Sequence, residues 1–91
     1  MGKFLVGHTL PSPATVEQAG MFAKAAKANL TLDAYWVGAT VQLNEQGKVT
    51  RIFCEWDAKD KESVQKVLSK VPGLPVDGIW PMMKVDAESY R

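Results

Sequence analysis

Hydrophobic and polar positions in the first half of the chain predict a strand, a helix and a second strand. Residues 4–6 are a short β-prone run that the proline-rich residues 11–13 should end. Thr15 and Gln18 have the spacing of a capping box, and apolar residues at helical spacing follow over residues 16–29. The apolar stripe of this helix is rich in alanine, so we expect it to pack closely on a sheet. Residues 32–43 have the β-branched and aromatic composition of a strand.

The second half of the chain repeats the order strand, helix, strand. Gly47 closes a predicted turn, and residues 49–57 read as the next strand. A helix should begin near Asp57 or Asp60, carry apolar residues at helical spacing and end at residues 72–73, Pro-Gly. Residues 79–85 form the last predicted strand. It contains Pro81, which cannot donate to a sheet ladder, so this strand should lie at an edge.

This order of elements predicts a single α+β domain over residues 1–91. The order β-α-β-β-α-β is that of the ferredoxin-like fold, a four-stranded antiparallel sheet with two helices on one face. Its strands lie in the spatial order 4-1-3-2, which places the fourth strand at an edge. The edge position expected from Pro81 therefore agrees with the topology.

The register of the central hairpin assigns side chains to the two faces of the sheet. If Leu43 pairs with Lys48, Gly38 lies across from Phe53 and Trp36 across from Glu55. One face is then almost wholly apolar and should pack under the helices. We expect a core of Phe22, Ala26, Val37, Val41, Ile52, Cys54, Trp56, Val64, Val67 and Leu68. The other, open face should form a pocket or an interface from Trp36, Arg51, Phe53, Glu55 and Asp57.

Composition and charge narrow the function classes. The formal net charge is +1, which offers no electrostatic attraction to nucleic acid or to an anionic membrane. The single cysteine, Cys54, has no partner for an internal disulfide, and the first residues lack a long apolar run. We therefore expect a cytoplasmic protein that binds neither nucleic acid nor a membrane.

Residues with catalytic or metal-binding chemistry are few. His8 is the one histidine, and a metal ion would require further ligands beside it. Cys54 is a candidate nucleophile, although a buried free cysteine usually serves as a small hydrophobe. Glu55 and Asp57 share a face and could do acid–base work as a carboxylate pair. Next to Arg51, they also fit a row of ion pairs on a solvated surface or an interface.

Several short motifs resemble those of a domain-of-unknown-function family of small ferredoxin-like proteins, whose best-described member binds nickel. The resemblance covers nearly the whole chain and implies a homodimer whose sheets face each other, with nickel as the metal and His8 as the candidate ligand. The chain departs from many relatives in having Val67, Leu68 and Val71 where they carry histidines. The motifs are Phe4-Leu5-Val6, Leu10-Pro11, Thr15, Tyr35-Trp36-Val37, Phe53-Cys54, Asp57-Ala58, Asp60, Gly73-Leu74-Pro75, Asp77 and Ile79.

Two functions are consistent with the sequence. The first is a small non-enzymatic homodimer that binds a small molecule or a metal ion between its open sheet face and its partner. The alternative is a dimeric α/β-barrel-type enzyme, similar to small monooxygenases, with a cleft on the open face and His8 or Glu55 as acid–base residue. The two differ in whether His8, Glu55 and Trp36 converge on one cavity. The sequence names neither a ligand nor a reaction.

Overall fold

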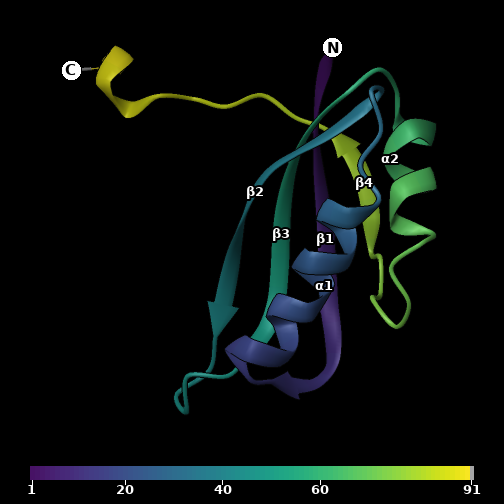
Figure 1. The fold of residues 1–91 in the computed structure, drawn as a ribbon. Coiled ribbons are helices and arrows are strands. Elements are labelled where there is room, and N and C mark those ends of the chain that lie inside the picture. The colour runs from purple at the N-terminus through teal and green to yellow at the C-terminus, as the bar shows by residue number, and fades with distance from the viewer. Residues whose placement is uncertain (91) are drawn as a thin grey trace.

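One antiparallel sheet, covered on one face by two helices, forms the body of the protein (Figure 1). The computed structural model describes residues 1–90. The strand order is β2-β3-β1-β4, and all three pairs of neighbouring strands are antiparallel, so the predicted ferredoxin-like fold is confirmed. The elements are β1 (Gly2–Ala14), α1 (Val16–Ala28), β2 (Ala34–Leu43), β3 (Val49–Ala58), α2 (Lys61–Leu68), β4 (Gly78–Pro81) and a 3₁₀ helix, η1 (Ala87–Tyr90).

Helix α1 begins at the capping residue that the sequence predicted, and α2 begins at Asp60, one of the two starts that the sequence left open. The Thr15 hydroxyl accepts a hydrogen bond from the backbone N–H of Gln18 at 3.1 Å, and the Gln18 side chain accepts one from the Thr15 N–H at 2.8 Å. Asp60 caps α2 by accepting from the backbone N–H of Ser63 at 2.8 Å. These bonds satisfy backbone donors that have no partner in the first helical turn, and so fix where each helix starts.

Prolines affect the two strands that contain them differently. Strand β1 does not end before residue 11 as expected, but continues to Ala14. Its ladder with β3 is interrupted between Thr9 and Ala14, so Pro11 and Pro13 lie where regular pairing is already lost. Strand β4 lies at the sheet edge, as predicted, and ends at Pro81 rather than at residue 85.

The hairpin register differs from the prediction because β2 is irregular in two places. Leu43 pairs with Val49, and the Asn44 side chain accepts hydrogen bonds from two backbone N–H groups in the longer turn. Phe53 therefore lies across from Thr40, not Gly38. A second irregularity falls between Trp36 and Gly38. An extra residue in a strand moves every side chain beyond it to the opposite face of the sheet. The side chains in the first part of β2 therefore lie on the faces opposite to those predicted.

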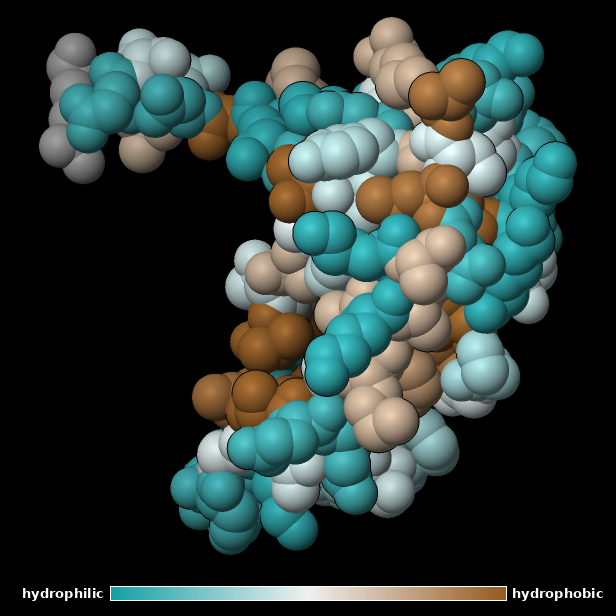
Figure 2. All heavy atoms as spheres, viewed as in Figure 1, coloured by the Kyte–Doolittle hydropathy of each residue, from teal (hydrophilic) through white to brown (hydrophobic). Residues whose placement is uncertain are grey.

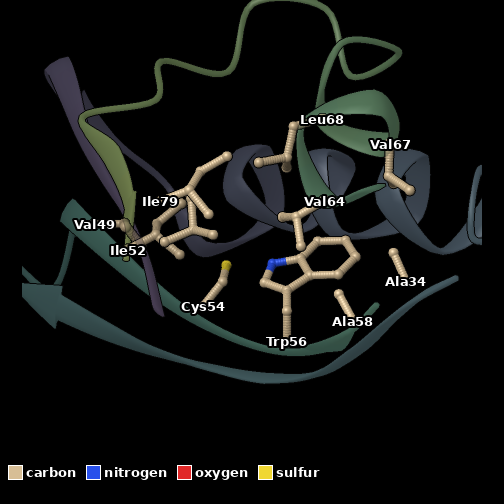
Figure 3. Packing of buried hydrophobic residues seen from close by; sticks show 11 residues of the cluster. Ala34, Val49, Ile52, Cys54, Trp56, Ala58, Val64, Val67, Leu68 and Ile79 are labelled. Carbon is tan, nitrogen blue, oxygen red and sulfur yellow. The ribbon is translucent and has the colours of Figure 1, made fainter. Parts of the chain in front are cut away.

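The buried core lies mainly between the sheet and α2. Trp56 projects from β3 toward this helix, beside Cys54 (Figure 3). The predicted core is right for β3 and α2 but wrong for Val37 and Val41, which are 44% and 42% exposed. Both residues lie on β2, which is an edge strand of the sheet. The buried residues of the hydrophobic core are Val6, Ala34, Val49, Ile52, Cys54, Trp56, Ala58, Val64, Val67, Leu68 and Ile79.

The last described residues run away from the body of the domain. Figure 1 shows the chain after β4 extending past the sheet to η1 rather than folding back across it. Met83, Val85 and Tyr90 in this segment are exposed. Over the described residues, no helix has the length and apolar character required to cross a membrane.

Candidate functional site

His8 lies on the helix-covered face of the sheet, in the middle of β1. It pairs with Ile52 of β3 and is only 1% exposed. Its Nδ1 lies 2.6 Å from the carbonyl oxygen of Pro75. Because a carbonyl oxygen only accepts, Nδ1 must carry the proton of this hydrogen bond. In the neutral imidazole, Nε2 then carries a lone pair and no proton.

Burial keeps the His8 ring neutral. Loss of hydration lowers the pKa of His8 below its ordinary value of 6.5, while the Pro75 carbonyl and the charge of Asp77 oppose that shift. The Nε2 atom is fully buried and has no hydrogen-bond partner among the described residues. His8 is therefore a buried side chain in the middle of a strand, with one acceptor atom unused.

A cavity of about 210 Å³ lies between α1 and the sheet, and His8 lines it. The alanine-rich stripe of α1 was expected to pack closely on the sheet, but of this helix only Ala26 is buried. Small side chains fill little of the space between the layers, and the cavity is what remains. Its lining residues are His8, Val16, Ala19, Gly20, Phe22, Ala23, Ala26, Trp36, Ala39, Val41, Val49, Ile52, Cys54, Trp56, Leu68 and Leu74.

The cavity opens between the start of α1 and β2. Val16 and Val41 line it and yet are 59% and 42% exposed, so they lie at its mouth. Apolar side chains gather in this region, over the end of β2 and beside α1 (Figure 2). A ligand could therefore enter along the edge of the sheet without displacing α2.

Trp36 lines this cavity instead of lying on the open face, which corrects its predicted position. The irregularity of β2 beside Val37 pairs Trp36 with Trp56 and turns its indole toward the helices. The Nε1 atoms of both tryptophans are buried without hydrogen-bond partners among the described residues. Figure 3 shows the indole nitrogen of Trp56 on the side of the ring nearest Cys54.

Cys54 contributes a protonated thiol to the same cavity. Burial raises its pKa to about 11, and the neighbouring Trp36 indole offsets the shift only in part. The thiolate is the nucleophilic and metal-binding form, so at neutral pH this cysteine has neither property. It serves as a small hydrophobic side chain, the plainer of the two roles expected for it.

The open face carries the other four residues that were predicted for it, Arg51, Phe53, Glu55 and Asp57. The Arg51 guanidinium lies 5.0 Å from the centre of the Phe53 ring. Lys3 of β1 donates hydrogen bonds to Glu55 and Asp57, each at 2.9 Å. These ion pairs lower the pKa of Glu55, chiefly through the hydrogen bond from Lys3. The carboxylates are thus partners of lysine rather than an acid–base pair.

Trp80 is an open-face residue that the sequence analysis did not single out. Its indole lies over Gly7 and Gly78, where a Cβ atom on Gly78 would collide with the ring. Leu5 pairs with Trp80 across the strands, and Phe53 pairs with Gly7. The paired glycines of β1 and β4 were the signal that could have located this indole, since glycine in a strand often allows a close approach.

The residues that were expected to converge on one cavity lie on two different faces of the sheet. His8 and Trp36 line one cavity, whereas Glu55 lies on the opposite face of the sheet. Nor is there, among residues 1–90, any group of three histidine, cysteine, aspartate or glutamate side chains that could hold a metal ion. Beside His8, the cavity has apolar or aromatic walls and the protonated Cys54 thiol, which do not fit a nickel site.

The buried neutral His8 should make stability depend on pH. Its folded pKa lies below the unfolded value of 6.5, so between the two values the unfolded chain binds more protons. The folded state should therefore lose stability as pH falls below 6.5, by at most about 1.4 kcal/mol per pH unit. Urea unfolding between about pH 7 and pH 5 measures this slope.

His8→Asn provides the control for this dependence. The carboxylates of Glu55 and Asp77 have pKa values below 4.5 and 3.8, so they contribute little over the same range. The variant should show a nearly flat profile there. An equal slope in both proteins would mean that another group is responsible.

Comparisons with known proteins give one family. The family described as nickel responsive protein SCO4226-like matches residues 4–82. No curated protein matches the chain. The crystal structure of SCO4226 from Streptomyces coelicolor A3(2) is similar, with a TM-score of 0.74 and 19% sequence identity over 92% of this chain and 99% of that one. At this identity, the likeness to the solved structure supports the fold alone. Since the family match covers most of its length, the chain belongs to the nickel-responsive SCO4226-like family.

Proposed function

We propose that this chain is a non-enzymatic binding protein that holds a small, mainly apolar molecule between α1 and the sheet. The observation that carries the proposal is the apolar cavity of about 210 Å³ that lies between α1 and the sheet, with the buried, neutral His8 among its lining residues. Ligand sites are typically apolar hollows with a few polar groups that fix orientation. This location replaces the pocket expected on the open face.

Catalysis finds less support than binding. The alternative enzyme needed His8 or Glu55 as acid–base residue near Trp36, but the sheet separates Glu55 from the other two. Glu55 is engaged by Lys3 at 2.9 Å and by Lys84 at 3.1 Å. A general acid or base must lie within hydrogen-bond reach of the group it serves. His8 would have to act with apolar walls on every side.

Nickel is a poor fit for the cavity. The family description refers to nickel, but His8 supplies one lone pair and Cys54 keeps its proton, whereas protein metal sites usually use several ligands. We propose that the ligand of this cavity is organic. The buried free Cys54 is consistent with a reducing compartment such as the cytoplasm.

Toluene and nickel chloride test the two kinds of ligand. A ligand that binds only the folded state raises the melting temperature. Saturating toluene should therefore raise the melting temperature of the wild-type chain, and calorimetric titration with nickel should show no tight one-to-one binding. Ala23 lines the cavity, so Ala23→Leu should fill it and remove the response to toluene.

Ala28→Leu is the matched control, because Ala28 is exposed at the end of α1 and does not line the cavity. It should keep the response to toluene. No response of the wild-type chain to toluene, together with tight nickel binding that is lost in His8→Ala, would overturn the proposed function.

The open face supports a second proposal, that two copies associate through it. Leu5, Phe53 and Trp80 form its apolar centre, and Trp80 is 48% exposed. Ion pairs of Lys3 and Lys84 with Glu55 lie around this centre. A surface with an apolar centre and charges of both signs is suited to a two-fold contact with itself. Beyond Lys84, which pairs with Glu55, the C-terminal segment extends past the sheet to η1 (Figure 1).

Phe53→Glu should convert this dimer to a monomer, because association would bury a carboxylate in the apolar centre of the contact. Sedimentation equilibrium measures the mass, and the wild-type chain should sediment at twice the monomer mass. Gln46→Glu adds the same charge in the exposed hairpin turn and should leave the dimer intact. A wild-type chain that stays at monomer mass at high micromolar concentration would rule out the dimer.

A further inference from the structure

We propose that residues 82–86 of one chain, the C-terminal arm, bind as an added strand to the outer edge of β2 in a second copy, and that this exchange is reciprocal. The inference rests on the second proposal above, that two copies associate through the open face. It adds the segment that each copy contributes to the other and the edge that receives it.

The C-terminal arm has the pattern of a strand but no partner in its own sheet. It follows β4 directly, and two exposed apolar residues, Met83 and Val85, alternate with charged ones along it. The Met82 N–H still donates to the Lys3 carbonyl at 3.0 Å. Among the described residues, no later backbone group of the arm is bonded to a strand. The arm is therefore a strand-like segment whose backbone groups are available to another molecule.

Strand β2 offers a complementary edge. It is an outer strand of the sheet, so one side of its backbone has no neighbouring strand. It contains neither proline nor a charged side chain, which commonly protect an exposed edge from pairing. Its register with β3 is uninterrupted from Gly38 to Gln42, a stretch of five residues that equals the arm in length. Val41, within this stretch, is an exposed apolar side chain against which the arm can pack.

The arm leaves its own domain from the open face. Lys84 is held over that face by its ion pair with Glu55 of β3 at 3.1 Å. Beyond Lys84 the chain extends past the sheet to η1 (Figure 1). In a dimer that forms through the open face, the arm of each copy therefore starts at the boundary with the other copy.

The small size of the apolar centre on the open face also favours a contribution from the arm. That centre consists of Leu5, Phe53 and Trp80. Stable interfaces usually take about 20–30 residues from each partner. A strand added to a sheet edge supplies backbone hydrogen bonds and side-chain contacts along its length. Because each copy has one arm and one β2 edge, a two-fold exchange satisfies both and closes the assembly.

NMR of mixed dimers tests the inference on the wild-type chain. We would mix ¹³C-labelled with unlabelled chains and record only the NOEs that connect a labelled molecule to an unlabelled one. These NOEs should join the Val85 methyl groups to side chains of residues 38–42. Amide hydrogen exchange within residues 38–42 should be slow also at the positions that face away from β3, since the arm would accept their hydrogen bonds.

Shortened chains connect the dimer to these contacts. A chain that ends at Met82 lacks most of the arm, so it should dimerise at least about tenfold more weakly in sedimentation equilibrium and lose the added protection of residues 38–42. A chain that ends at Asp86 keeps the whole arm and should behave as the wild type. Lys84→Ala removes only the exposed ion pair with Glu55 and should change the affinity little. Residues 83–86 are exposed, so these changes leave the core intact.

The outcomes separate the exchange from the dimer itself. Arm contacts found only within one chain would overturn the exchange, and so would a chain ending at Met82 that keeps both the wild-type affinity and the protection of residues 38–42. Either result would leave a dimer formed by the open faces alone. A wild-type chain that stays monomeric would overturn the exchange together with the dimer.

Discussion

The hydrogen bond from His8 Nδ1 to the Pro75 carbonyl determines much of this structure. It joins the middle of β1 to the loop between α2 and β4, across 67 residues of sequence. The residues on either side of His8 hold the same loop. The Gly7 carbonyl accepts from the Asp77 N–H at 2.8 Å, and the Thr9 hydroxyl donates to the Asp77 carboxylate at 2.7 Å. This set of bonds places β4 at the edge of the sheet and fixes the tautomer of the buried imidazole.

The remainder of the site depends on how differently the two helices cover the sheet. Helix α2 buries Val64, Val67 and Leu68 against β3 and fills its half of the core. Helix α1 presents mainly alanine and glycine to the other half, where the cavity lies. A helix with such a face contributes little apolar burial, so it is the less firmly held of the two. The protein thus combines a well-packed half with a hollow half in one small domain.

The sequence was sufficient for the order of elements, because each signal was local: the cap at Thr15, the cap at Asp60 and the missing donor of Pro81. It was insufficient for the face of Trp36, because an irregularity in β2 has no strong local signature and reverses the side chains beyond it. The role of His8 was missed for another reason. Its partner, Pro75, is a distant backbone carbonyl, which no side-chain motif reveals.

The most direct test of this account is the tautomer of His8 at neutral pH, read from the ¹⁵N chemical shifts of its ring in long-range ¹H–¹⁵N spectra. The account predicts a neutral ring with the proton on Nδ1 and a free lone pair on Nε2, because the Pro75 carbonyl can only accept. A proton on Nε2, in either the other neutral tautomer or the imidazolium ion, would contradict it.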